Sequence, residues 1–121
     1  MTRRRWLPFA LLSLLIGALA ALFIGGGLRA TELPTPILPL DDAYIHFQYA
    51  RALAEGHPFR YNPDQPPTSG ATSLLYPFVL ALGYRLGFAG EALAWWALGA
   101  GILTWLGAAW LLFRLIEAES N

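Results

Sequence analysis

Long apolar runs without any ionisable side chain flank a polar central stretch in this chain. One run extends from Trp6 to Leu28 and another from Ala92 to Phe113. At about 1.5 Å of rise per residue, each would form a helix of roughly 33–35 Å, which exceeds the ~30 Å hydrocarbon core of a bilayer. We therefore predict membrane-spanning helices over about residues 6–28 and 92–113.

A shorter apolar stretch, from Ser73 to Gly90, predicts a further span of about 27 Å, although Arg85 interrupts it. An arginine near the end of a span reaches the headgroup region with its long side chain. Hydrophobic residues make up 56% of the chain and charged residues 13%, about half the usual charged share of a soluble domain. The prediction is an all-α integral membrane protein, a single module over residues 1–121 with about three transmembrane helices.

The N-terminus indicates an orientation. Arg3, Arg4 and Arg5 precede the first span, and the positive-inside rule then places the N-terminus in the cytoplasm. The loop from about residue 29 to residue 72 would be extracytoplasmic. A cleaved secretory or twin-arginine signal is the rival interpretation, but an apolar run of about 23 residues is longer than the ~7–15 of a signal peptide. This length favours an uncleaved anchor in a multi-pass protein of the bacterial inner membrane.

The polar loop carries the pattern of an amphipathic helix. Asp41 and Asp42 follow a proline-rich stretch, and aspartate at a helix start caps free N–H groups and complements the positive end of the helix dipole. Gly56 suits the position just after the last turn. We predict a helix from Asp41 or Asp42 to near Glu55, on the membrane surface or against other helices. Arg51 and Glu55 are four residues apart and so predict an ion pair.

The same acids are the main candidates for chemistry. Adjacent carboxylates repel each other, and such pairs serve as general bases or cation sites. His46 lies one turn after Asp42, so that both could face a common metal or substrate. The competing interpretation is ordinary helix capping by the acids and a solvated His46. The chain has no cysteine, which excludes disulfides and thiolate metal sites, and its arginines are scattered rather than forming a nucleic-acid-binding face.

Several short blocks in and after this helix resemble one recurrent segment of a known superfamily. In order, they are Asp41-Asp42-Ala43-Tyr44-Ile45, Tyr49-Ala50-Arg51, Leu53-Ala54-Glu55-Gly56-His57, Tyr61-Asn62-Pro63 and Gly70-Ala71-Thr72-Ser73. Together they are similar to the first extracytoplasmic loop of bacterial membrane glycosyltransferases with the GT-C fold, including mannosyltransferases and arabinosyltransferases. The resemblance covers roughly residues 6–88. It departs from the family at Asp64 and Gln65, where relatives often have Gly-Glu.

The resemblance implies a transferase that moves a sugar from a polyprenyl-phosphate carrier to an extracytoplasmic acceptor hydroxyl. By its position, Asp41 matches the acid proposed as catalytic base, and Asp42 would tune it or help bind a divalent cation. Arg51 and Arg60 are candidates for the cationic residues that would bind the leaving phosphate. Tyr44 and His46 complete the expected substrate contacts, because an aromatic ring stacks on a sugar face.

Enzymes of this superfamily contain many more spanning helices, so the chain is expected to be the N-terminal part of a larger enzyme and inactive alone. Its partners would be the bilayer, the lipid-linked sugar and the rest of the enzyme. The alternative is a small non-catalytic membrane protein that docks a partner helix. Stripes of small residues allow such close approach; here they are Ser13, Gly17, Ala21 and Gly25 in the first span, and Ala100, Thr104 and Ala108 in the last.

Overall fold

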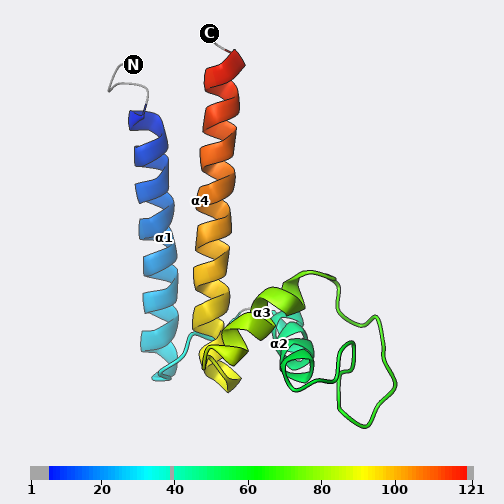
Figure 1. Ribbon diagram of the computed structural model, residues 1–121. Coiled ribbons are helices and arrows are strands. Elements are labelled where there is room, and N and C mark those ends of the chain that lie inside the picture. Colours follow the sequence, from blue (N-terminus) through cyan, green and yellow to red (C-terminus); the bar gives the residue numbers. More distant parts are fainter. Residues whose placement is uncertain (1–5, 39, 120–121) are drawn as a thin grey trace. The chain divides into compact units, whose positions relative to one another are not determined.

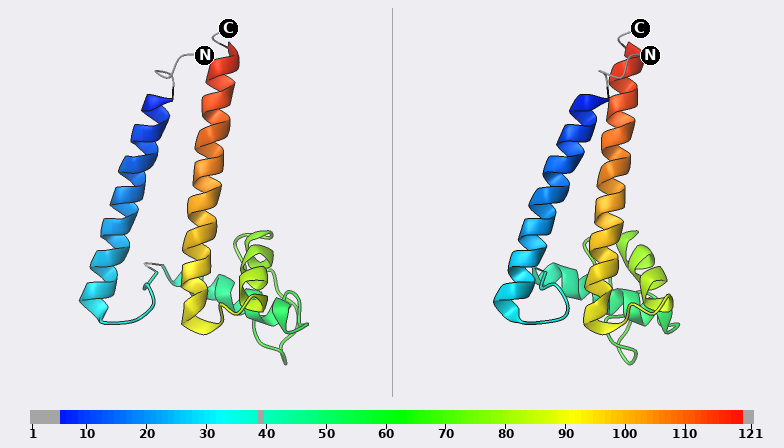
Figure 2. Two further views of the ribbon diagram at one scale, coloured as in Figure 1. Left: turned by 60° about the vertical axis from the view of Figure 1, so that its left-hand side comes forward. Right: turned by 90° about the vertical axis from the view of Figure 1, so that its left-hand side faces the viewer.

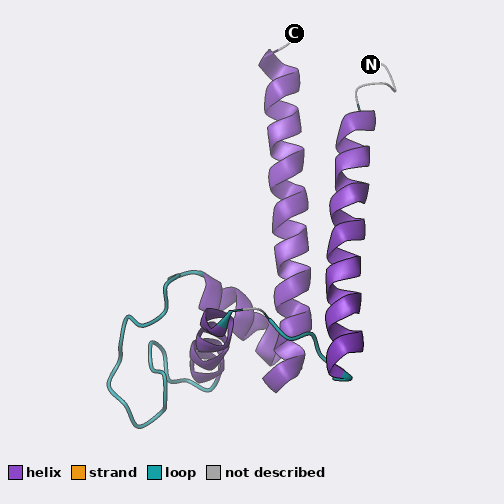
Figure 3. Cartoon of the chain, turned by 180° about the vertical axis from the view of Figure 1, so that it is seen from behind, coloured by secondary structure: helices purple, strands orange, loops and turns teal. Residues whose placement is uncertain are grey.

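The computed structural model describes residues 6–38 and 40–119, and every regular element in this part of the chain is a helix (Figure 3). The elements, labelled in Figure 1, are α1 (Leu7–Thr31), α2 (Asp41–Ala54), α3 (Tyr76–Arg85), the short 3-10 helix η1 (Gly90–Ala92) and α4 (Leu93–Glu119). The all-helical prediction is confirmed. Arg3, Arg4 and Arg5, on which the expected orientation depends, lie outside the described residues.

The helices belong to two compact units, one of residues 6–33 and 101–119 and the other of residues 34–100. In the first unit, the start of α1 meets the late part of α4. The ring centroid of Phe113 lies 4.6 Å from that of Trp6 and 5.9 Å from that of Phe9. The two helices therefore run antiparallel in this unit, as the ribbon views show (Figures 1 and 2).

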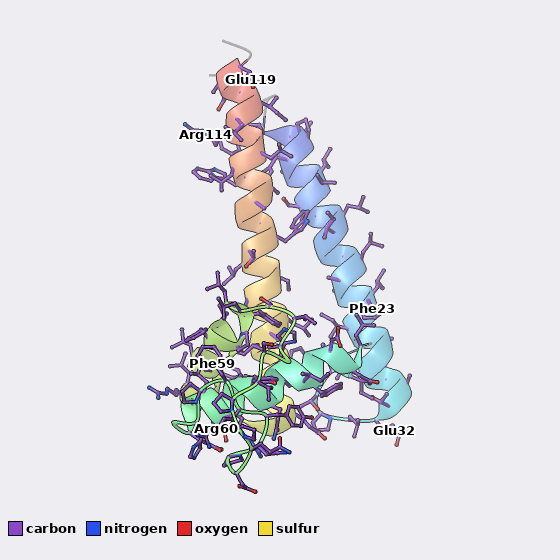
Figure 4. The ribbon with its side chains drawn as sticks, turned by 90° about the vertical axis from the view of Figure 1, so that its right-hand side faces the viewer. Phe23, Glu32, Phe59, Arg60, Arg114 and Glu119 are labelled. Carbon is purple, nitrogen blue, oxygen red and sulfur yellow. The ribbon has the colours of Figure 1, made fainter. Side chains whose placement is uncertain are left out.

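Within the described residues, two helices are long and apolar enough to cross a membrane: α1, and α4 together with η1. No residue of α1 is buried, and side chains such as Leu22 and Phe23 are 73% and 68% exposed. Figure 4 labels Phe23 on this helix. A signal sequence near the N-terminus passes the same test of length and composition.

Both long helices extend beyond the predicted spans. The first prediction ended at Leu28, but α1 stays helical through its three consecutive glycines and ends at Thr31. The hydroxyl of Thr31 donates to the carbonyl of Gly27 at 2.9 Å, which ties down the last turn. The last prediction ended at Phe113, but α4 continues to Glu119. The Arg114 guanidinium lies over the ring of Trp110, one turn earlier, at 5.7 Å.

The predicted span over residues 73–90 is wrong in its length. The α-helix in this stretch, α3, has 10 residues. Its length of about 15 Å is half the thickness of a bilayer core. Pro77 stands in the first turn, where proline is tolerated, and Gly87 after the end has φ 103°, a conformation that stops the helix. Leu80 of α3 is fully buried within the second unit. Within the second unit, α3 therefore packs in a small core.

That core joins α2, α3 and the first turns of α4. Its buried residues are Phe47 and Ala50 of α2, Leu80 and Ala81 of α3, and Leu93, Ala94 and Ala97 of α4. Trp96 packs beside them: its indole Nε1 donates to the carbonyl of Val79 at 2.8 Å. This indole therefore holds α3 against the start of α4.

The small-residue stripe of α1 is only partly covered within the chain, since Gly25 is partly buried like Ser13. Phe9, Ser13 and Ile16 are partly buried, whereas Gly17 and Ala21 are exposed. A Cβ added at Gly17 would meet nothing within 4 Å. At Gly17 the stripe therefore leaves open space among the described residues.

Candidate functional site

The paired acids occupy the first turn of α2. The residue that caps this helix is Leu40, with extended backbone (φ −127°, ψ 136°), and no side chain caps the helix. Asp41 and Asp42 are both exposed, and neither carboxylate has a hydrogen bond or ion pair among the residues that the structure describes. Their negative charges interact favourably with the positive end of the helix dipole. The acids therefore start the helix without closing a capping contact, and their oxygens face solvent.

The predicted end of α2 is confirmed. Glu55 follows its last residue, and Gly56 adopts φ 90°. The Gly56 N–H donates to the carbonyl of Leu53 at 3.2 Å, and the His57 N–H donates to the carbonyl of Ala52 at 2.8 Å. These two bonds form a Schellman motif, in which glycine takes the left-handed position at lowest cost.

His46 is buried rather than solvated, with 6% of its surface exposed. Its Nδ1 donates to the backbone carbonyl of Asp42 at 2.8 Å, which assigns the ring proton to that nitrogen. Its Nε2 lies 3.4 Å from the hydroxyl of Thr72, which then donates to it. The ring centroid lies 5.4 Å from that of Tyr76.

Because protein atoms engage both nitrogens, neither is free to bind a metal ion together with the two carboxylates. Within residues 6–38 and 40–119, no three histidine or acidic side chains gather as a metal site would require.

Asp42 and His46 line one hollow of about 310 Å³ in the second unit. Most of its other walls are apolar, from Leu38, Leu40, Ala43, Ala97 and Leu98. Tyr76 completes the lining, and burial raises the pKa of its phenol. Asp41 lies outside this hollow. The exposed carboxylate of Asp42 lines this apolar recess and can accept a proton from an alcohol whose carbon skeleton rests in it.

The structure separates the expected cationic residues from the acids. Arg51 is ten positions along α2 from Asp41, about 15 Å of helix. Its Nε lies 4.0 Å from Oε1 of Glu55, which confirms the predicted pair. Arg60, labelled in Figure 4 on the loop after α2, donates from Nη1 to the carbonyl of Pro63 at 2.9 Å. It closes its own turn rather than approaching Asp41.

Arg51 instead belongs to a second cavity, of about 370 Å³, on another face of α2. Tyr44, one turn after Asp41, also lines it, so the two expected substrate contacts are brought together away from the acids. The full lining is Tyr44, Phe47, Gln48, Arg51, Tyr61, Tyr84, Gly90, Glu91 and Leu93. The spacing of Tyr44, Gln48 and Arg51 places them on one helix face, so this part of the lining could have been predicted from the sequence. Tyr84 and Glu91 come from distant elements, so their place in the lining could not be predicted from spacing along the chain.

A third and larger cavity, of about 550 Å³, lies where α2, α3 and the intervening loop meet. Apolar side chains such as Leu53, Phe59 and Phe78 form much of its wall, with hydroxyls from Tyr49, Thr68 and Ser73. The Tyr49 hydroxyl is hydrogen-bonded to that of Thr68.

Comparison of the chain with protein-family models, with curated proteins and with solved structures finds no match. The resemblance to the glycosyltransferases therefore depends on the sequence blocks themselves.

Proposed function

We propose that this chain is part of a bacterial inner-membrane glycosyltransferase, with Asp41 as the catalytic base. The observation that carries the proposal is the pair of exposed carboxylates at the start of α2, which have no partner among the described residues. A base must reach its substrate's proton, and a carboxylate already held in an ion pair or cap is less able to do so. The ordered sequence blocks around Asp41 support the family.

The membrane part of the proposal rests on α1 and α4. A helix as apolar as α1 with no buried residue leaves its surface in contact with water unless lipid covers it, at a cost of roughly 25 cal/mol per Å² of apolar area. We propose that these two helices are the spans and that residues 34–92 lie on the extracytoplasmic side. Two spans return the end of α4 to the cytoplasm, whereas the three originally predicted would leave it outside.

In this proposal, the acceptor hydroxyl gives its proton to Asp41 as its oxygen attacks the anomeric carbon. The bond from that carbon to the phosphate oxygen breaks, and the polyprenyl phosphate leaves with the electron pair. Attack from the face opposite the phosphate inverts the anomeric configuration. Asp42, the neighbouring carboxylate at the rim of the hollow, would orient the acceptor or bind a divalent cation. Since Arg51 and Arg60 are engaged elsewhere, the positive charge that receives the phosphate would come from other parts of the enzyme.

The test is sugar transfer by the complete enzyme in membranes, from a radiolabelled polyprenyl-phosphate sugar. Asp41→Asn keeps the size of the side chain but removes the base, and we expect transfer to fall by about 10²–10⁴-fold. Asp64→Asn, the same change at an exposed loop acid, is the control and should retain full activity. Near-wild-type transfer by the Asp41→Asn enzyme would refute the assignment.

A second function, docking of a partner helix without catalysis, is favoured by the open space at Gly17 and Gly25, where an added Cβ meets nothing within 4 Å. Small residues on such a face let another helix approach closely. On this alternative, Gly17→Leu would abolish assembly with the partner, and Asp41→Asn would have no effect.

A further inference from the structure

The cavity beside Arg51 is walled by aromatic rings. Tyr44, Tyr61 and Tyr84 line it together with Phe47. These residues come from α2, from the loop after it and from α3, so only the folded unit assembles them. Its volume of about 370 Å³ lies at the small end of the ~300–1,000 Å³ typical of small-molecule sites.

The aromatic walls are held in place from outside the cavity. The backbone N–H of Leu38 donates to the Tyr44 hydroxyl at 3.2 Å, and the Tyr84 hydroxyl donates to Oε1 of Glu55 at 3.1 Å. The Tyr61 ring packs edge-on against that of Tyr49, with the centroids 5.8 Å apart. Rings fixed in this way lose little conformational freedom when a ligand binds.

The polar lining groups are anchored in the same manner and keep hydrogen-bonding capacity. Nε2 of Gln48 donates to Oδ1 of Asn62 at 3.3 Å, which leaves its carbonyl oxygen as an acceptor. The hydroxyl of Thr35 donates to Oε2 of Glu91 at 3.2 Å, leaving Oε1. Nε of Arg51 is buried, has no hydrogen bond in the described part of the chain and lies 4.0 Å from Oε1 of Glu55, an ion pair that holds the guanidinium beside the cavity.

The charge of the lining selects the class of ligand. One cation, Arg51, and one anion, Glu91, contribute to it, so an ionic ligand of either sign meets an unfavourable partner. A neutral ligand with several hydroxyls can donate to the carboxylate and accept from the guanidinium. The electron-rich faces of tyrosine also attract the weakly positive C–H groups of a sugar ring.

We propose that this cavity binds a neutral sugar, as a monosaccharide or the end of a longer glycan. The site lies apart from the hollow beside Asp42, and its ability to bind does not require Asp41. The inference rests on the proposed function only for the use made of the bound sugar, which would be recognition of a glycan acceptor.

The experiment is a titration of the purified full chain in lipid nanodiscs, followed by amide NMR. The probes are the uncharged methyl glycosides of glucose, galactose and mannose, with cyclohexanol as a ring bearing one hydroxyl and inorganic phosphate as an anion. We expect saturable shifts at Gln48 and Glu91 with at least one glycoside at millimolar concentration. Cyclohexanol and phosphate should cause none at these positions.

Variants of the lining residues test whether the NMR shifts come from glycoside binding in this cavity. Arg51→Gln and Glu91→Gln should each weaken glycoside binding by about tenfold, because each removes a hydrogen bond from a charged group. Arg85→Gln makes the same change at an exposed arginine outside the cavity and should alter the affinity by less than about twofold. Backbone amide spectra establish that each variant is folded.

The proposal is overturned if no glycoside shifts these signals, if phosphate or cyclohexanol binds as well as the glycosides, or if Arg85→Gln weakens binding as much as Arg51→Gln. Failure of the base assignment is a separate result. Asp41→Asn should bind the glycoside like the unaltered chain, whatever its effect on sugar transfer.

Discussion

Gly83 of α3 lies directly against the indole ring of Trp96 of α4. A Cβ built on Gly83 would come within 2.3 Å of the ring atoms Cγ and Cδ1, closer than atoms approach in real structures. The ring centroid of Phe88 lies 5.6 Å from that of Trp96, so the indole is packed by residues within and just after α3. This contact fixes α3 against the start of α4.

The first prediction concerns that contact. Gly83→Ala should lower the free energy of unfolding of the second unit by about 1–3 kcal/mol, because the added methyl overpacks the indole. This loss outweighs the ~1 kcal/mol that alanine gains over glycine in helix propensity. The measurement is thermal unfolding in nanodiscs, with the NMR signal of the Trp96 indole N–H as a local probe.

Gly99→Ala is the matched control for Gly83→Ala. It makes the same change in a helix of the same unit, at a glycine whose added Cβ would meet nothing within 4 Å. We expect it to leave stability unchanged or slightly raised. Equal destabilisation by both variants would show that the Trp96 contact does not determine the effect.

The second prediction is a pH dependence at Tyr84. The hydrogen bond that its phenol donates to Glu55, together with burial and the charge of that carboxylate, raises the pKa of Tyr84. The fold therefore favours the neutral phenol. This contribution to stability is fully present below the unfolded pKa of ~10 and is lost as the pH rises through the higher folded value. Glu55→Gln should bring the Tyr84 pKa down.

Tyrosine ¹³Cζ NMR during a pH titration measures this change. Tyr76 is the internal control, since burial rather than Glu55 raises its pKa, and its titration should not move in the Glu55→Gln variant. A Tyr84 titration that also fails to move would contradict the assignment of the shift to this hydrogen bond.

The sequence predicted the elements that local rules determine. Both long helices were predicted from the apolar runs. The start of α2 was predicted from the aspartates and its end from Gly56, each to within one residue. Each of these features depends on side chains within a few positions of one another. The Arg51–Glu55 pair, one turn apart, was predicted for the same reason.

What the sequence did not predict depends on contacts between distant segments. Hydropathy alone made residues 73–90 a span, because the burial of Leu80 in a small core and the contact of Gly83 with Trp96 are tertiary effects. The same holds for His46: its partner Thr72 is 26 positions away. Tyr84 and Glu91 join Arg51 only in the folded unit, so the second cavity was not foreseen.

The proposed function requires Asp41 to lie on the extracytoplasmic side of a membrane crossed by α1 and α4. Because the chain has no cysteine, single cysteines at three exposed positions, Asp41→Cys, Ala89→Cys and Glu119→Cys, each report one location. A membrane-impermeant maleimide tests them in intact and in permeabilised cells. We expect labelling of positions 41 and 89 in intact cells and of position 119 only after permeabilisation. Protection of position 41 in intact cells would contradict it, and labelling of 41 but not 89 would restore the third span.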